Sequence, residues 1–414
     1  MIHGDLSGYS RLLRQAVQEI MGEDVSDRSW LLSSVAIRFG GLGIRPPDAH
    51  ASAAYLASFA SISELAGKID AQFDPADSGG HSSIQSAISD FNSRVTDADR
   101  LQHLAGACVQ QKLSESIDKA TLASLRRDHG SDPYWLAHLA LVGAEGAGAW
   151  LTANPEDAVR DIEPSLFRIA FRRRCRVRVQ MADAPCMACG GVMDSWGDHA
   201  LVCPCRGDRT VRHNVIRDLV FAEANHAGCA PEKEKGHLLP GRSLEDGAAP
   251  RHDAPPQSDE RRRPADIWFP RGVGERAGRP AAVDFAITSG LRADRIERAK
   301  DGGQAVSDDY AITKRTFLAT EQKCHAAGFS FIPLVFEAHG GGWGTQTRKS
   351  LGFVSQQLQA VGDWCREGIP LRLAQRISCS LQREAARAVL RRLATDGETE
   401  DSFLAYEEGE DSDV

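Results

Sequence analysis

The amino-acid sequence predicts a mixed α+β (or α/β) protein with a helical N-terminal part, a small metal-binding module, and a mixed sheet flanked by helices. Three observations predict this class. Apolar residues in the first 160 positions have helical spacing. Three cysteines and one histidine lie within residues 186–203. Short apolar runs bounded by glycine and proline, the pattern of strands, follow residue 264 and lead into further helical patterns.

Composition sets the broad class. Of the 414 residues, 42% are hydrophobic and 26% charged, as in ordinary globular proteins. No apolar run reaches the roughly 18 residues of a membrane span, and residues 1–5 lack the pattern of a signal peptide. Ten cysteines without such a signal indicate reduced thiols or metal ligands. We therefore expect a nuclear or cytoplasmic protein, not a secreted one, with no membrane partner.

The formal net charge of −8 comes from the C-terminus. Nine acids fall within residues 395–414, a tail whose composition predicts disorder, and the rest of the chain is close to neutral. Arginines cluster in that remaining part, at residues 168–178 and 261–263. The distribution of charge therefore says more about nucleic-acid binding than the overall balance does.

Residues 1–160 are predicted to be helical, without visible catalytic groups. Helical spacing recurs in residues 12–20, 49–60, 105–125 and 133–141. Glycines at 40, 41 and 43 permit a tight turn, and residues 74–83 are typical of a linker.

A dense arginine cluster follows. From residue 174 to 179 the pattern changes to a period of two, as in a strand with one arginine face. Like charges at this density repel unless a polyanion neutralises them, which predicts nucleic-acid binding by Arg172, Arg173, Arg174, Arg176 and Arg178. The alternative is an ordinary solvated charged face.

Residues 186–203 carry the strongest local signal. Cys186 and Cys189 form a CxxC pair, followed by His199 and Cys203. Three thiolates and one imidazole predict a closed tetrahedral zinc site, with Cys205 as an alternative fourth ligand. A redox CxxC would not need the later histidine and cysteine. Because so small a module has almost no core, we expect the metal to hold most of its fold.

Residues 211–228 are predicted to form a helix that carries a buried carboxylate. Ile216, Leu219 and Val220 form its apolar stripe, and Glu223 continues that stripe. A carboxylate there needs a partner, and a metal would be one. The alternative is a glutamate at the rim of the core.

Two acids mark a predicted hairpin. Asp266 precedes one short apolar run and Asp284 follows another, with a loop rich in glycine, proline and arginine between them. Neighbouring strands lie about 4.8 Å apart, so the two carboxylates can bind one Mg²⁺. The alternative is a pair of ordinary surface aspartates beside a turn.

The elements after the hairpin complete the sheet. Residues 291–309 are expected to be irregular, and residues 310–327 to form a helix with Lys314 on a half-apolar face. Residues 329–336 are predicted to be a buried strand, and residues 354–364 and 371–393 to be helices. Residues 231–239 are the candidate for a first strand.

The order α-β-β-β-α-β, with Pro264-Ala265-Asp266 in place of the first acidic motif, resembles the PD-(D/E)xK nuclease core. With the CCHC knuckle upstream, residues 186–344 resemble the C-terminal region of non-LTR retrotransposon proteins that carry a restriction-like endonuclease. The segments GGLGI (40–44) and AAYLAS (53–58) resemble the part that follows the polymerase core in those proteins. Two positions depart from the pattern: Ala265 separates the proline from the aspartate, and Ala286 stands where a lysine is common.

The resemblance implies functions for these residues. In that family the catalytic lysine lies on the following helix, which points to Lys314. Asp266 and Asp284 would bind catalytic Mg²⁺, with Glu223 as a possible additional acid, and the knuckle would bind structural Zn²⁺. The implied activity is nicking of DNA for target-primed reverse transcription, with DNA and possibly element RNA as partners. No polymerase motif is present in the sequence, so we expect a longer or separate chain to supply the polymerase.

The resemblance also implies a division into five parts, with boundaries at 1–160, 161–210, 211–345, 346–394 and 395–414. The first is the post-polymerase-like helical region, the second the basic segment and knuckle, and the third the endonuclease core. C-terminal helices and the acidic tail follow. Two other classes of function stay open: a catalytically dead nucleic-acid-binding module with the same fold, and a zinc-stabilised scaffold for protein interactions.

Overall fold

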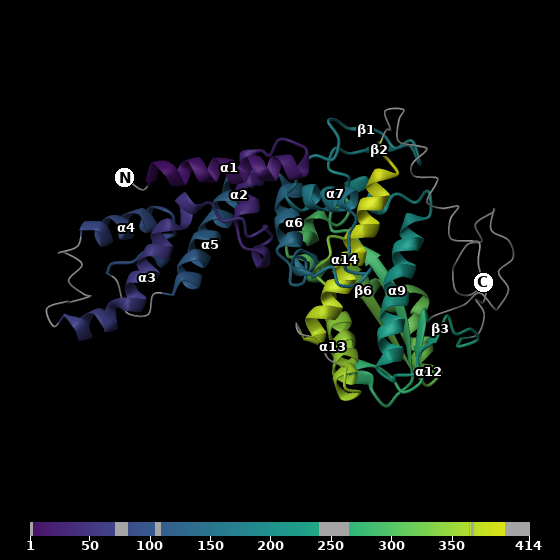
Figure 1. Ribbon diagram of the computed structural model, residues 1–414. Coiled ribbons are helices and arrows are strands. Elements are labelled where there is room, and N and C mark those ends of the chain that lie inside the picture. The colour runs from purple at the N-terminus through teal and green to yellow at the C-terminus, as the bar shows by residue number, and fades with distance from the viewer. Residues whose placement is uncertain are drawn as a thin grey trace.

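A computed structural model of the chain describes residues 3–70, 82–103, 109–239, 265–363, 365 and 368–393. The helices before the sheet are α1 (His3–Met21), α2 (Asp27–Ser34), α3 (Pro47–Ile69), α4 (Ser82–Ser93), α5 (Gln110–Asp128), α6 (Pro133–Val142), α7 (Pro164–Arg174), α8 (Asp198–Val202) and α9 (Asp208–His226). Those within and after it are α10 (Ile296–Ala299), α11 (Gly303–Thr316), α12 (Thr320–Ala326), α13 (Thr345–Ala360) and α14 (Ile369–Leu390). The four-stranded sheet and the helices around it form the main body, and the helices α1, α3, α4 and α5 project from it (Figure 1).

The strands form two sheets. The larger has the order β3 (Glu232–Lys233), β4 (Ile267–Phe269), β5 (Ala281–Thr288) and β6 (Ser330–Glu337). The pairs β3–β4 and β4–β5 are antiparallel. The pair β5–β6 is parallel, with Asp284 opposite Pro333. The smaller sheet is a hairpin of β1 (Ala184–Pro185) and β2 (Val192–Met193). The structure thus confirms a mixed helix-and-sheet class with a mixed sheet.

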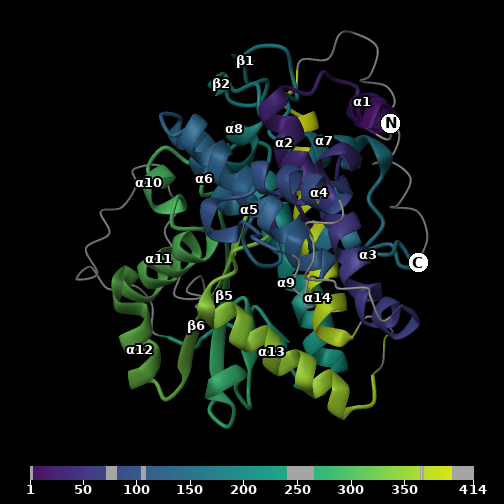
Figure 2. The same cartoon turned by 90° about the vertical axis from the view of Figure 1, so that its left-hand side faces the viewer.

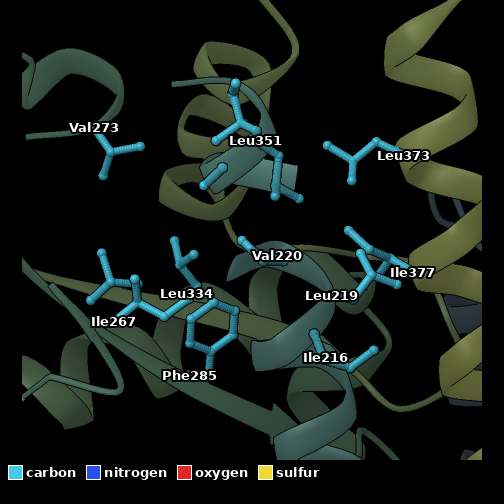
Figure 3. Packing of buried hydrophobic residues seen from close by; sticks show 14 of the residues in the cluster. Ile216, Leu219, Val220, Ile267, Val273, Phe285, Leu334, Leu351, Leu373 and Ile377 are labelled. Carbon is cyan, nitrogen blue, oxygen red and sulfur yellow. The ribbon is translucent and has the colours of Figure 1, made fainter. Parts of the chain in front are cut away.

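The main core lies on one face of the larger sheet. Alternate residues of β5 and β6, among them Phe285 and Leu334, pack against α9, α13 and α14 (Figure 3). Residues on the opposite face, such as Ala286 and Val335, pack against α11. All eight residues of β6 are buried, as expected for a strand covered on both faces. Figure 2 shows the sheet between these two groups of helices.

The C-terminal helices belong to this same core. Leu351, Val354 and Leu358 of α13, and Leu373 and Ile377 of α14, lie in one apolar cluster with α9 and the sheet. The residues on the two sides of the expected boundary at residue 345 therefore share one hydrophobic core. α14 also packs against α7 and α8, so it links the sheet to the rest of the body.

Several expected elements differ in extent. Residues 291–309 are not irregular, because α10 and the start of α11 lie there. The single helix expected at 310–327 is broken into α11 and α12 at Phe317–Ala319, where Leu318 and Ala319 have positive φ angles of 50° and 54°. Residues 174–179 form no strand, since Arg174 ends α7 and Arg176 has a φ of 54°. Of residues 231–239, only Glu232–Lys233 pair as a strand.

The cysteine module also differs from expectation, because it has an apolar core. Cys186, Met193 and Cys203 are buried in one cluster with residues of α7 and α14, including Ile169 and Val389. The module is therefore held by packing against two long helices as well as by any bound metal. This corrects the premise that the module has almost no core.

Candidate metal centre and carboxylate site

The four side chains predicted to bind a metal come together. The Sγ atoms of Cys186, Cys189 and Cys203 and a ring nitrogen of His199 all lie within 4.8 Å of one another. Cys189 Sγ and His199 Nε2 are 3.3 Å apart. Tetrahedral zinc, with bonds of about 2.3 Å to sulfur and 2.0 Å to nitrogen, separates its ligand atoms by roughly 3.3–3.9 Å. The cluster could therefore hold a metal ion such as zinc, and Cys205 is not part of it.

Backbone hydrogen bonds shape the first half of this cluster. The Cys186 N–H donates to Gly191 O over 2.6 Å, and the Gly190 N–H donates to Cys186 O over 2.8 Å. Gly190 has a φ of +71°, a conformation that a side chain disfavours. The CxxC turn is thus closed by its own backbone, with both thiols on one side.

Asp194 fixes the second half. Its Oδ2 accepts a hydrogen bond from the His199 N–H at 2.7 Å, and its Oδ1 accepts from the N–H groups of Trp196 and Asp198 at 3.0 Å each. These bonds satisfy the first amides of α8, the short helix that carries His199. One carboxylate therefore sets the direction of the helix that presents the imidazole.

The Cys203 thiol is prepared for deprotonation. Burial raises its pKa, but hydrogen bonds from Arg392 and from the Cys205 backbone outweigh burial and bring the pKa to about 6. Arg392 is held in place by a further bond to Cys205 O at 2.8 Å. Because the thiolate is the form that binds metals, this environment suits a ligand.

The two aspartates of the hairpin meet at the larger sheet, as predicted. Asp266 immediately precedes β4, and its Oδ2 accepts a hydrogen bond from the Phe285 N–H of β5 at 2.6 Å. Asp284 is the fourth residue of β5 and its pKa is raised, first by burial and also by the negative charge of Asp266. Both carboxylates are partly accessible, with exposed fractions of 23% and 20%.

Lys314 completes the arrangement that the sequence predicts. Its Nζ lies 2.9 Å from Asp284 Oδ2, and it reaches the sheet from α11. Burial lowers the pKa of Lys314, but the Asp284 carboxylate outweighs burial and raises it, so the lysine is a cation at neutral pH. Two carboxylates and one ammonium group within a single half-buried site suit a hard divalent cation and an anionic substrate.

A histidine that sequence reasoning missed joins this site. His213 Nε2 on α9 lies 3.1 Å from Asp266 Oδ2. The hydrogen bond to Asp266 raises the pKa of His213, although burial opposes it. One signal was available: His213 extends the stripe of Ile216, Val220 and Glu223 by one helical turn toward the N-terminus.

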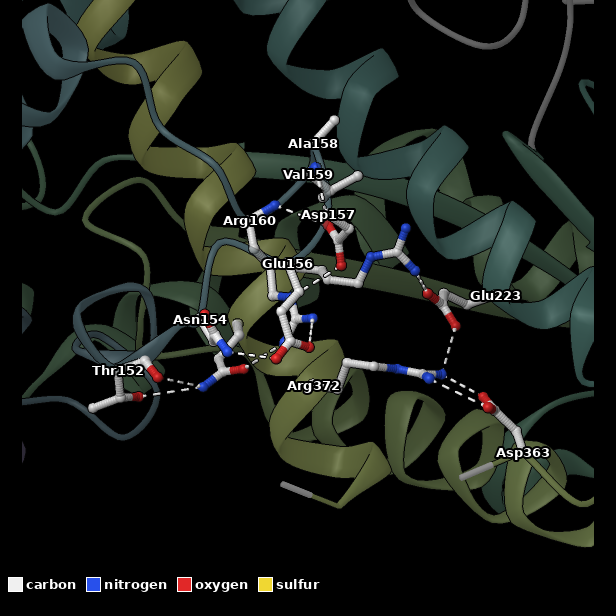
Figure 4. Close-up of polar contacts among 12 residues, drawn as sticks. Thr152, Asn154, Glu156, Asp157, Ala158, Val159, Arg160, Glu223, Asp363 and Arg372 are labelled. Atoms are coloured by element: carbon white, nitrogen blue, oxygen red, sulfur yellow. Dashed lines mark hydrogen bonds and ion pairs between the residues drawn. The ribbon is translucent and has the colours of Figure 1, made fainter. Parts of the chain in front are cut away.

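Glu223 has partners other than a metal. Its carboxylate forms ion pairs with Arg372, at 3.7 Å, and with Arg376, both on α14. Figure 4 shows that Arg372 also pairs with Asp363, and that a second group of contacts, between Arg160 and Asp157, lies beside this network. The residues line a polar pocket of about 760 Å³. The expectation that a metal would satisfy Glu223 is thus corrected: arginines of α14 satisfy it, and His213 approaches Asp266 from α9 instead.

Most of the predicted nucleic-acid-binding arginines point into the protein. Arg173, Arg174 and Arg176 are buried, with exposed fractions of 4%, 4% and 6%. Arg174 donates to the carbonyl oxygens of Gly41, Ala147 and Ile37 at 2.9–3.1 Å.

The neighbouring arginines are also engaged. Arg176 pairs with Asp198 at 2.6 Å, and Arg172 donates to Met21 O and Gly22 O. Only Arg178 of the five is exposed. Backbone carbonyls accept the hydrogen bonds of Arg172 and Arg174, and Asp198 pairs with Arg176, which corrects the assignment of these arginines to a phosphate-binding surface.

Two of the other sequence predictions lie outside the described residues: the second arginine cluster, Arg261–Arg263, and the acidic tail at 395–414.

Among the helices that the structure describes, none has the length and apolar character to cross a membrane. No protein-family model matches the chain, and no curated protein matches it.

Proposed function

We propose that this chain is a divalent-metal-dependent DNA endonuclease with a restriction-like core. The observation that carries the proposal is the meeting of Asp266, Asp284 and Lys314 at one site, from two strands and the helix that follows them. The element order supports it: α9, β3, β4 and β5 are followed by helices α10, α11 and α12 and then by β6, an α-β-β-β-α-β order with a helical segment before the last strand.

The residues would divide the work as follows. A bound Mg²⁺ supplies a coordinated water of lowered pKa and neutralises charge on the scissile phosphate. Asp266 and Asp284 provide the carboxylate oxygens that hold such an ion. Lys314, next to Asp284, is placed to orient the attacking water and to offset negative charge that develops on the phosphoryl oxygens.

We also propose that Cys186, Cys189, His199 and Cys203 bind a structural Zn²⁺. The support is the closed set of four soft ligands and the lowered pKa of Cys203. In the context of the non-LTR elements that residues 186–344 resemble, the nick would prime reverse transcription by a polymerase from another segment or chain. DNA would be the partner, with element RNA as a second candidate partner, in the nucleus or cytoplasm.

Nicking of supercoiled plasmid by zinc-loaded protein with Mg²⁺ or Mn²⁺ tests the proposal. Asp284→Ala should abolish nicking but not DNA binding, because removing a carboxylate reduces repulsion of phosphate. Lys314→Ala should slow nicking at least about 10-fold, a modest share of the 10²–10³-fold that one oxyanion donor can contribute. Lys323→Ala, on α12, is the matched control and should nick normally. Nicking that survives the loss of both aspartates would refute this site.

A catalytically dead nucleic-acid-binding module is the second candidate. One observation favours it: Ala286, where the nuclease pattern often has lysine, faces the apolar residues Ala311 and Val335. Folded protein that binds DNA but nicks none with either cation would support this candidate over the enzyme.

A further inference from the structure

We propose that His213 is a positioning residue that orients Asp266 for cation binding, by holding Oδ2 so that Oδ1 faces the ion. This inference rests on the proposed nuclease function and adds a residue to the same site. The residue comes from α9, which also contributes Ile216, Leu219 and Val220 to the apolar core and Glu223 to the ion pairs with α14.

The hydrogen bonds of Asp266 are one-sided. In the described part of the chain, the two that its carboxylate accepts both fall on Oδ2, from His213 Nε2 at 3.1 Å and from the Phe285 N–H at 2.6 Å. Because an ionised carboxylate only accepts, Nε2 of His213 carries the proton in this bond. Two donors on one oxygen fix the rotation of the carboxylate and leave the other oxygen for a ligand.

The imidazole is itself held in place. Its Nδ1 lies 3.2 Å from the Asn214 side chain, and its ring meets the Phe285 ring edge-on at 6.4 Å between centroids. Other charged groups near the site are Asp284 and Lys314, and Arg217 of α9, whose charge interacts with Asp266. His213 is therefore a fixed donor on a rigid helix, as is common for groups that orient a metal ligand.

Two other interpretations make different predictions. If His213 acted only through its positive charge, its removal would strengthen cation binding, since one cation fewer would lie near the site. If it only tied α9 to the sheet, its removal would lower stability and leave cation affinity unchanged. Positioning predicts that cation binding weakens, by about 10-fold or more, the usual cost of losing a partner of a metal ligand.

The test measures Mn²⁺ binding by electron paramagnetic resonance, on the full zinc-loaded chain at one fixed pH. The Asp284→Ala variant gives the background from other sites. His213→Ala should weaken the specific binding about 10-fold or more. His213→Gln should retain affinity within about threefold, because its amide N–H₂ can donate from nearly the position of Nε2. His226→Ala, on the same helix and 65% exposed, is the control and should bind as wild type does.

Thermal unfolding of each variant separates folding from binding. Wild-type affinity in a folded His213→Ala protein overturns the inference, and so does tighter binding. Failure of Gln to restore affinity in a folded protein also overturns it. The proposed nuclease function fails separately, if wild-type protein shows neither Mn²⁺ binding above the Asp284→Ala background nor nicking.

Discussion

Buried arginines are the most unusual residues of this chain, and each has a different partner. Arg174 binds three carbonyl oxygens from the loops around Ile37, Gly41 and Ala147. Burial lowers its pKa to about 10, which still leaves it charged at neutral pH. A guanidinium group can do this because its five N–H donors spread in a plane, so one side chain satisfies several carbonyls at once.

Replacing Arg174 should therefore destabilise the folded state. Arg174→Ala removes the donor to Gly41 O and Ala147 O, whereas Ile37 O keeps the Gly40 N–H. Each buried unsatisfied group costs roughly 1–3 kcal/mol. We expect the free energy of unfolding to fall by at least about 2 kcal/mol, measured by urea denaturation. Arg178→Ala is the control, because Arg178 is exposed and makes one bond, to Met181 O at 3.3 Å. Equal stability of the two variants would contradict the internal role of Arg174.

Residue patterns in the sequence predict where a side chain lies on its own strand or helix, but not which distant elements it contacts. Local periodicity places Asp266 and Asp284 at strand ends and Lys314 on a helical face, and the structure brings these three side chains together. Their catalytic roles were implied by the resemblance and stay a prediction. His213 and the arginine partners of Glu223 were missed, since they depend on how α9 packs against β5 and α14. The arginine cluster was misread for a related reason. Charge density alone does not distinguish a polyanion from backbone carbonyls that distant loops bring together.

At the scale of elements, local signals predicted type better than extent. The hairpin of β4 and β5 and the buried strand β6 agree with the apolar runs and their glycine and proline boundaries. The break between α11 and α12 was missed, because positive φ angles at Leu318 and Ala319 leave no mark in composition. The packing of α13 and α14 into the sheet core was also missed, since it is a tertiary property.

The cysteine module should respond locally to loss of its metal. Cys186→Ser, or chelation, should reduce bound zinc from about one per chain and increase hydrogen exchange in residues 184–203. The sheet should keep its protection, because β5 and β6 have their own apolar core. Elemental analysis and hydrogen exchange measure the two effects. Exchange throughout β6 after chelation would show instead that the module, through α7 and α14, is required for the whole fold.

At the scale of the whole molecule, the arginines of α7 and the following turn connect separate regions. Arg172 reaches the end of α1, and Arg176 reaches Asp198 at the start of α8. Arg173 Nη2 lies 3.4 Å from His339 Nε2. The other ring nitrogen of His339, Nδ1, lies 3.1 Å from Oε1 of Glu337, at the end of β6. One short segment therefore ties the N-terminal helices, the cysteine module and the sheet to each other.

This internal role changes which residues can supply affinity for DNA. Because Arg172, Arg173 and Arg174 bond groups within the protein, the phosphate contacts that the proposed DNA binding requires must come from other residues. The strongest remaining cluster in the sequence is Arg261–Arg263, directly before Asp266. Each phosphate contact that releases a counterion contributes about −0.9 to the slope of log K against log salt.

Replacing Arg261, Arg262 and Arg263 together by alanine should flatten that slope by up to about 3, and should leave stability unchanged. The measurement is DNA affinity by fluorescence anisotropy from low to moderate salt. The matched control removes three exposed charges of α5, Lys119, Arg126 and Arg127. Equal flattening in both variants would mean that net charge acts at long range. An unchanged slope in the first variant would mean that phosphates bind to another surface. Each phosphate contact releases counterions from the DNA, so the loss of such a contact must flatten the slope.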